Sequence, residues 1–293
     1  MQRAERRGTA MGSDVQVVVW ARARAARLAD LAVHRVDLLE QCWSRFRPGS
    51  ELNRLNARAG QGPVAVSDDL HLLVATLMRA WEWTEGDVDA TVLGAMVAMG
   101  YDRDFADVIS SPLPAHWSSQ PGAGMSRLAL EDGHVSLPRG VGLDPGAVGK
   151  GLAGDIVTSE IADAGADAVL VSIGGDIVTV GTPPDSEGWC VSLRDDRTPS
   201  RDEIEVLTLA GPHCAVATSS TLRRRWSGRH HVLDPRSGLP ASGDIVQATV
   251  VADRGWRAEA GATLALLRGS AGADWLTQRG CTARLLDGAA ARA

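Results

Sequence analysis

The sequence has few cysteines, no long apolar run and no excess of basic residues. Its four cysteines are widely separated and include no Cys-x-x-Cys pair, so neither a structural zinc site nor a redox dithiol is expected. No segment reaches the roughly 18 apolar residues of a membrane span. The only apolar run near the Arg-rich start, residues 15–20, is short and interrupted by Gln16. A secretory signal needs an uninterrupted apolar segment, so we expect a cytoplasmic protein with no membrane span.

Charge and composition narrow the class of protein further. The chain has 30 Lys and Arg against 36 Asp and Glu, a formal charge of -6. General nucleic-acid binders carry a basic excess, so no nucleic-acid partner is expected, although this charge is compatible with a locally held phosphate ligand. With 293 residues, 44% hydrophobic and 23% charged, the chain has the composition of a globular protein that can bury a sizeable core.

Hydrophobic periodicity predicts strands and helices in an α+β order. Residues 11–20 alternate and are β-branched, which predicts a strand, and the Ala/Leu-rich residues 23–41 predict a helix. Ser67 is a suitable N-cap for a second helix, because apolar residues from Leu70 to Trp81 recur on one helical face. Further strands are expected at 126–130 and 134–137, as a hairpin, and at 168–173, 177–180, 189–193, 204–209 and 245–252.

The remaining segments complete this organisation. One helix is expected to begin near Ala147 and another to cover residues 257–268, while the Pro-, Ser- and Gly-rich residues 110–124 predict a loop. Antiparallel runs of strands between separate helices favour an α+β fold over a doubly wound parallel sheet. We predict a disordered N-terminus (1–10), a single domain (11–287) and a C-terminal tail (288–293).

Common nucleotide and hydrolase motifs are missing. The segment around Gly149 and Lys150 is reminiscent of a phosphate-binding P-loop, but Asp144 stands where the first Gly is required and Gly151 where Ser or Thr is required. No Gly-x-Gly-x-x-Gly opens a helix. The sequence also contains no His-Glu-x-x-His and no Gly-x-Ser-x-Gly.

Six unusual segments remain, and their order along the chain is informative. They are Thr9-Ala-Met11-Gly12-Ser13; the run from Ser44 to Asn56; Val88-Asp-Ala-Thr-Val92; Leu143-Asp-Pro-Gly-Ala-Val-Gly-Lys-Gly151; Thr218-Ser-Ser220 leading to His231-Val-Leu-Asp-Pro-Arg-Ser-Gly238; and Ala258-Glu-Ala-Gly-Ala-Thr263. In this order they resemble the FAD:protein FMN transferase family, also called ApbE, over residues 11–269.

The resemblance implies an α+β, T-fold-like architecture of antiparallel sheets with packed helices. It implies Mg²⁺-dependent transfer of the FMN half of FAD to a Thr hydroxyl, with release of AMP, on a target protein bearing a Ser/Asp-Gly-Ala-Thr-like motif. It also implies three sets of site residues. The catalytic base is His231; the FAD-binding residues are Met11, Phe46, Asp89, Ala90, Thr91, Asp144, Lys150 and Val232; and the metal ligands are Ala147, through its carbonyl, Glu259 and Thr263.

Several of these residues carry chemistry that can be argued without the family. Asp144 to Gly151 would place glycines and the Lys150 cation at a helix N-terminus, which suits a pyrophosphate and equally suits a tight helix entry. Glu259 and Thr263 share one helical face because they are four residues apart, and oxygen ligands suit Mg²⁺. The family usually has Asp where Glu259 stands, so the carboxylate is displaced by about one C–C bond length.

Other assignments leave alternatives open. His231 can accept a proton from a Thr hydroxyl; His230 competes with it, since adjacent strand residues face opposite ways. Asp89 can serve as a simple helix cap. Ser220 stands where the family has Gly, and Ala90 where it has Pro. Because of these departures and that of Glu259, an FAD-binding protein and an FAD pyrophosphatase remain alternatives to the transferase.

Overall fold

The computed structural model describes residues 1–108, 121–122, 124–198 and 200–288, so most of the loop expected at 110–124 lies outside the described residues. Its centre is a seven-stranded sheet in the order β1-β2-β6-β7-β10-β15-β16, with every neighbouring pair antiparallel. These strands are β1 (Gln2–Ala10), β2 (Ser13–Ala21), β6 (Ala168–Ile173), β7 (Asp176–Val180), β10 (His213–Ser220), β15 (Ile245–Ala252) and β16 (Thr282–Asp287). The predicted α+β architecture of antiparallel sheets is confirmed.

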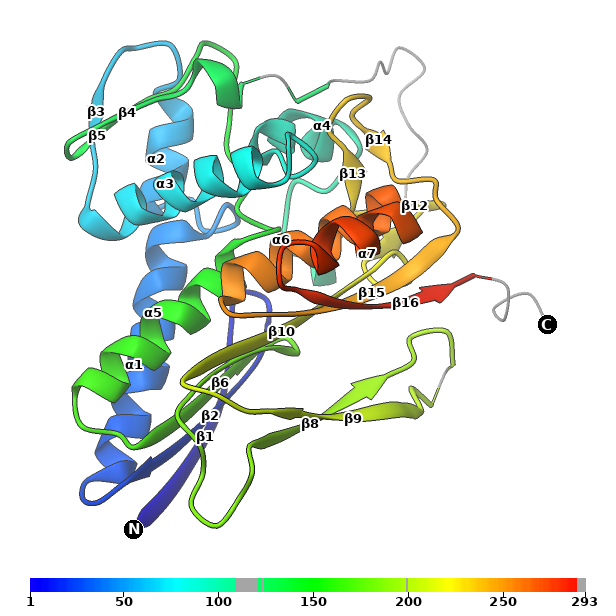
Figure 1. The fold of residues 1–293 in the computed structure, drawn as a ribbon. Coiled ribbons are helices and arrows are strands. Elements are labelled where there is room, and N and C mark those ends of the chain that lie inside the picture. The colour runs from blue at the N-terminus through cyan, green and yellow to red at the C-terminus, as the bar shows by residue number, and fades with distance from the viewer. Residues whose placement is uncertain (109–120, 123, 199, 289–293) are drawn as a thin grey trace.

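Helices cover one face of this sheet and a separate β-hairpin covers the other (Figure 1). Apolar side chains of the first helix, from Leu28 through Val36 to Trp43, recur on its buried face. The hairpin buries Trp189, Val191 and Leu193 at every second position against the sheet. The helices on this sheet are α1 (Ala25–Trp43), α5 (Gly149–Asp163), α6 (Gly255–Arg268) and α7 (Ser270–Thr277); the hairpin is β8 (Trp189–Arg194) and β9 (Glu203–Leu209).

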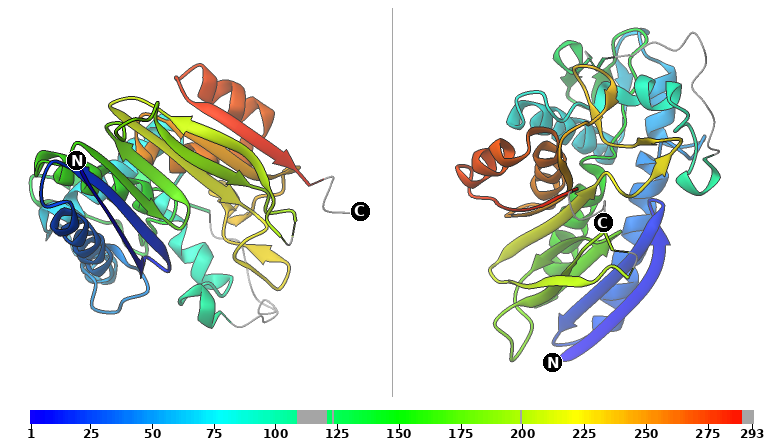
Figure 2. Two further views of the ribbon diagram at one scale, coloured as in Figure 1. Left: turned by 90° about the horizontal axis from the view of Figure 1, so that it is seen from below. Right: turned by 90° about the vertical axis from the view of Figure 1, so that its right-hand side faces the viewer.

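A smaller region lies beyond the end of the main sheet, as the two views of Figure 2 also show. Its helix α3 (Asp68–Trp83) is capped as expected, because the Ser67 hydroxyl accepts a hydrogen bond from Leu70 N at 3.3 Å. The rest of this region and its short hairpins are α2 (Glu51–Ala57), α4 (Leu93–Ala98), β3 (Val64–Ala65), β4 (Ala129–Glu131), β5 (His134–Ser136), β11 (Arg225–Trp226), β12 (Arg229–His230), β13 (Leu233–Asp234), β14 (Leu239–Pro240) and the 3-10 turns η1 (Ala90–Val92), η2 (Phe105–Asp107) and η3 (Met125–Arg127).

The prediction of a disordered N-terminus is wrong. Residues 2–10 form β1, which pairs with β2 along its whole length and lies at an edge of the sheet. An edge strand gains its stability from backbone pairing with a single neighbour, so it does not need strong apolar alternation, and charged side chains are typical there. In β1 only Ala4 and Ala10 are buried, which explains why its Arg-rich sequence gave no strand signal.

Met11 does not belong to the strand predicted at 11–20 but to the turn before it. Ala10 pairs with Ser13, so Met11 and Gly12 form a two-residue hairpin loop. Both have positive φ, 54° for Met11 and 63° for Gly12, as a type I′ turn requires. This turn places Met11 at the tip of the hairpin, where it lines the cavity described below.

Replacing Gly151 with Ala is expected to destabilise the fold strongly. A Cβ at position 151 would lie 2.2 Å from the Gly255 carbonyl oxygen, where α5 meets the start of α6. Because backbone on both sides cannot yield cheaply, we expect a loss of about 3 kcal/mol and a fall in Tm of about 10 °C. Thermal unfolding followed by circular dichroism measures this, with Gly49→Ala as control, since a Cβ there meets nothing within 4 Å. Equal Tm values for the two variants would contradict the close approach.

Candidate active site

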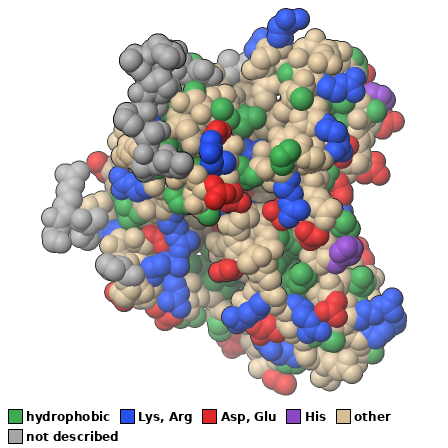
Figure 3. Space-filling model, turned by 180° about the vertical axis from the view of Figure 1, so that it is seen from behind, with side chains coloured by type: hydrophobic (Ala, Val, Ile, Leu, Met, Phe, Trp, Pro, Cys, Tyr) green, Lys and Arg blue, Asp and Glu red, His purple; other side chains and the backbone are tan. Residues whose placement is uncertain are grey.

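One large cavity, of about 1020 Å³, opens beside the start of α5 and the β1–β2 turn. All the predicted site residues except Thr91 line it, although they come from segments far apart in the sequence. On the face shown in Figure 3, acidic and basic side chains are interspersed. The lining residues from the prediction are Met11, Phe46, Asp89, Ala90, Asp144, Ala147, Lys150, His231, Val232, Glu259 and Thr263.

Thr91 is buried and supports the cavity wall from behind. Its hydroxyl donates to the Asp89 carboxylate at 2.5 Å and accepts from Gly124 N at 3.1 Å. Asp89 also accepts from Thr91 N at 2.7 Å, so it caps η1 while its side chain lines the cavity. Burial raises the pKa of Asp89, against the effect of its two bonds to Thr91. Capping and cavity lining, which were alternatives in the sequence, are thus both present.

Lys150 is held between two carboxyl groups at the cavity wall. Its ammonium donates to Asp176, at the start of β7, and to Glu259 of α6. The other Glu259 oxygen accepts from Gly151 N at 2.8 Å. Burial raises the pKa of Glu259 to about 7, with Lys150 opposing the shift. Burial also opposes the charge on Lys150, but the two carboxylates outweigh it and raise the pKa of Lys150.

Lys150 is therefore satisfied by protein carboxyl groups, whereas the sequence suggested that it faces a pyrophosphate. Two acidic groups against one ammonium leave this cluster suited to a further cation rather than to an anion. The sequence analysis did not identify Asp176 as a site residue. A signal was present, because Asp176 directly follows the Gly174-Gly175 turn and is a polar residue at the start of a strand.

The predicted metal ligands fit a divalent cation that prefers oxygen. Glu259 and Thr263 line the same cavity from one face of α6, opposite Ala147 at the entry to α5. Gly151 N donates to Glu259 rather than to the Ala147 carbonyl. The described residues contain no cluster of three or more His, Cys, Asp or Glu side chains that could hold a metal. A carboxylate, a hydroxyl and a carbonyl would suit Mg²⁺, which completes its shell with water and substrate oxygens.

Arg45 is a second residue that the sequence analysis missed. It pairs with Asp144 at 2.9 Å, and both side chains are nearly inaccessible to solvent. The Arg45 guanidinium also stacks 4.0 Å from the Phe46 ring centroid and 4.3 Å from that of Tyr101. Asp144 N donates to the Ala90 carbonyl at 2.8 Å, and this hydrogen bond joins the Leu143–Gly151 segment to the Val88–Val92 segment. Arg45 lies inside the Ser44–Asn56 run, from which the sequence analysis assigned only Phe46 to the site.

The two neighbouring histidines face different surroundings. His231 lines the cavity, and its Nδ1 is buried without a hydrogen-bond partner among the described residues. Burial, together with the charges of Arg224, His230 and Lys150, lowers the pKa of His231 to about 3. The Nδ1 of His230 is likewise without a partner among the described residues, but His230 does not line the cavity, and its Nε2 contacts the Ala241 carbonyl at 3.0 Å. The geometry therefore favours His231 as the imidazole available to a substrate.

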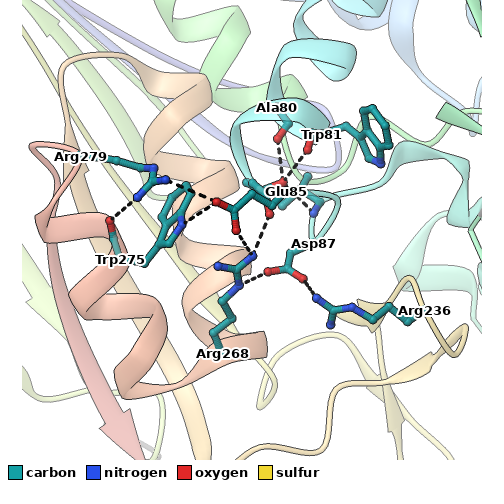
Figure 4. A network of polar contacts seen from close by, with 10 residues as sticks. Ala80, Trp81, Glu85, Asp87, Arg236, Arg268, Trp275 and Arg279 are labelled. Carbon is teal, nitrogen blue, oxygen red and sulfur yellow. Dashed lines mark hydrogen bonds and ion pairs between the residues drawn. The ribbon is translucent and has the colours of Figure 1, made fainter. Parts of the chain in front are cut away.

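Asp87 joins three segments that carry site residues (Figure 4). Its fully buried carboxylate contacts Arg236, within the His231–Gly238 segment, and Arg268, at the end of α6. Arg268 also donates to the Thr84 carbonyl at 3.1 Å and to Glu85 at 3.2 Å. Asp87 is two residues before Asp89, and its two arginines belong to the His231 segment and to α6, so these ion pairs link the Asp89, His231 and Glu259 segments. Loss of Asp87 would leave the charges of both arginines uncompensated.

Acidification is expected to destabilise the protein partly through His231. Its folded pKa of about 3 lies below the unfolded value of about 6.5, so the unfolded state binds more protons between these values. Stability from a neutral His231 is fully present above pH 6.5 and falls as pH decreases, by about 2 kcal/mol at pH 5. Urea unfolding at pH 7 and pH 5 tests this. His231→Gln should lose less stability over that interval than the wild type; an equal loss would contradict the buried neutral imidazole.

Known proteins share this fold, and about a quarter of the aligned residues are identical in the relatives found by sequence. A protein named FAD:protein FMN transferase from Salmonella typhimurium is 26% identical over 284 residues, covering 93% of this chain and 80% of the relative. One of the same name from Treponema pallidum is 28% identical over 282 residues, covering 88% and 77%. The crystal structure of the ApbE protein of Thermotoga maritima superposes with a TM-score of 0.85 at 23% identity, covering 98% of this chain and 94% of that one.

These comparisons place the chain among the flavin transferases. The flavin transferase ApbE of Vibrio cholerae shares the fold as well, with a TM-score of 0.80 at 21% identity, over 98% of this chain and 94% of that one. The model of the ApbE family matches residues 11–285, so the chain belongs to the ApbE family. The family resemblance recognised in the six motif segments is confirmed.

Two sequence expectations concern location and domain limits. Within the described residues, every helix is too short or too polar to cross a bilayer. The cytoplasmic location stays a prediction, as does the division into a domain at 11–287 and a tail at 288–293; residues 289–293 lie outside the described part of the chain.

Proposed function

We propose that this protein transfers the FMN half of FAD to a threonine hydroxyl of a target protein and releases AMP. The observation that best supports this is the meeting of all six motif segments in one cavity. The cavity volume of about 1020 Å³ is at the upper end for small-molecule sites, which suits a dinucleotide. The relatives from Salmonella typhimurium and Treponema pallidum are named FAD:protein FMN transferase, which supports the transfer of FMN from FAD to a protein.

The reaction needs a base, because a Thr hydroxyl is a weak nucleophile at neutral pH. His231 takes the hydroxyl proton while the Thr oxygen attacks the phosphorus of the FMN half. The new P–O bond forms as the bond from this phosphorus to the oxygen bridging to the AMP phosphate breaks. The electron pair stays on that bridging oxygen, and AMP leaves. The His231 imidazole is neutral, as a proton acceptor must be, and its Nδ1 has no other hydrogen-bond partner among the described residues.

The other residues bind and orient the substrate. Met11, Phe46, Ala90 and Val232 contact FAD, while Asp89 and Asp144 shape the loops around it; Thr91 and Arg45 support these loops from behind. Ala147, Glu259 and Thr263 would hold Mg²⁺, with Lys150 and Asp176 orienting the Glu259 carboxylate. Bound there, Mg²⁺ would neutralise charge on the pyrophosphate.

Intact-mass spectrometry tests the proposal. The purified protein is mixed with FAD, Mg²⁺ and a small domain bearing a Ser-Gly-Ala-Thr motif, alongside the same domain with that Thr changed to Val. We expect the target to gain the mass of FMN less one water, and no gain for the Val form or in EDTA. Intact bound FAD without transfer would overturn the proposal in favour of a binding protein. Free FMN and AMP would overturn it in favour of a pyrophosphatase, with water replacing Thr.

A further inference from the structure

Arg224 lies in the connection between β10 and β11 and lines the cavity. Its backbone has a φ of 45°, in the left-handed region that non-glycine residues rarely adopt. Such conformations persist where the surrounding structure imposes them, and they are common at functional sites. The guanidinium Nη2 lies 3.5 Å from the hydroxyl of Ser13, the first residue of β2.

Arg224 differs from the two arginines on either side of it. Arg223 is exposed and pairs with Asp196 at 3.2 Å. Arg225 is exposed on β11 and does not line the cavity. Arg224 is only partly exposed and has no carboxylate within ion-pair distance among the described residues. The basic run at 223–225 is therefore not a uniform solvated face.

Most other cations that line the cavity are already neutralised by a carboxylate. Besides Arg224, only Arg194 lacks such a partner among the described residues, and it is exposed on β8 and directs its Nη1 to the Arg201 carbonyl at 3.3 Å. The pairs are Arg7 with Glu5, Arg45 with Asp144, Lys150 with Asp176 and Glu259, and both Arg201 and Arg223 with Asp196.

Arg224 also acts on the same part of the cavity as the proposed base. After burial, its positive charge is the largest contribution that lowers the pKa of His231. Burial raises the pKa of Tyr101, and the charge of Arg224 opposes that rise. In the proposed reaction the acceptor oxygen lies between His231 and the phosphorus of the FMN half. Arg224 lines the same cavity as His231, where this phosphorus would lie.

We infer that Arg224 is a phosphate ligand of this site, which binds the phosphate of the FMN half and stabilises its charge during transfer. The inference rests on the proposed function. A guanidinium offers two parallel N–H donors that match phosphate oxygens, and a donor directed at developing charge contributes most to the rate. Lys150 and Arg45 would have to break an ion pair with a carboxylate before they could bind a phosphate, whereas Arg224 would not.

Affinities for FAD, FMN and riboflavin test the inference without requiring turnover. They are measured by fluorescence titration for the wild type, Arg224→Gln and the adjacent control Arg225→Gln. We expect Arg224→Gln to lose at least tenfold in affinity for FAD and FMN and to bind riboflavin as the wild type does. Arg225→Gln should bind all three normally. The salt dependence of FMN binding should also weaken in Arg224→Gln, because one phosphate contact is lost.

Two results would overturn the inference. Equal losses for riboflavin and FMN would make Arg224 a structural residue, and unchanged affinities would remove it from the site. If Arg224→Gln does not fold, Arg224→Lys is compared in the same way, since it keeps the charge but loses the paired donors; again, a loss confined to the phosphorylated flavins supports the inference and any other pattern refutes it. A wild type that binds no flavin would instead refute the proposed function itself.

Discussion

Replacing His231 with Gln is expected to slow FMN transfer by about 10²–10⁴-fold, the usual contribution of a general base, while FAD still binds. Gln keeps much of the size of the side chain but cannot accept the Thr proton. Because His231 is neutral and only one of many cavity-lining groups, its loss should leave the affinity for FAD nearly unchanged. Single-turnover transfer to the Thr-bearing domain gives the rate, and flavin fluorescence gives the affinity.

His230→Gln is the matched control for this variant. His230 is adjacent in the sequence, carries the same ring and lies outside the cavity, where it contacts the Ala241 carbonyl. Transfer by this control should remain within a fewfold of the wild type. Normal transfer by His231→Gln would remove His231 from the mechanism, and a large loss confined to His230→Gln would show that the two roles are reversed.

Replacing Glu259 with Gln is expected to weaken Mg²⁺ binding by at least about tenfold, in line with losses seen on changing groups at metal sites. Gln removes one of the two carboxyl groups on Lys150, so the cluster loses the excess of negative charge that favours a further cation. The Glu259 carboxylate now accepts hydrogen bonds from Lys150 and from Gly151 N, and a Gln amide would turn its NH2 donor toward one of these two donors. Isothermal titration with Mg²⁺ measures the affinity directly, and transfer should fall with it at limiting Mg²⁺.

Two further variants make this test specific. Asp253→Asn removes an exposed carboxylate just before α6 and should leave Mg²⁺ affinity unchanged. Glu259→Asp restores the residue usual in the family, but it is shorter by about 1.5 Å and would lose the reach to Gly151 N and Lys150 together. We therefore expect Glu259→Asp to bind Mg²⁺ less well than the wild type. A gain in affinity and transfer would mean that this chain has drifted from catalysis.

Local features of this protein follow from the sequence by itself. The strands at 168–173 and 245–252 coincide with β6 and β15, because compact apolar runs bounded by polar residues leave little choice of backbone state. The Ser67 cap and the Asp89 cap also depend only on residues two or three positions away. The motif order sufficed to recognise the family, since that comparison needs no knowledge of contacts.

The partners of each site residue were decided only by the tertiary structure. Lys150 meets Asp176 and Glu259, which are 26 and 109 residues away, because the packing of α5 against the sheet and α6 brings them together. Local spacing carries no information about such pairs, so Lys150 was assigned to a phosphate and Arg45, Asp87 and Asp176 were missed. The same reason explains β1, whose residues become a strand because β2 supplies a paired edge that their own sequence does not predict.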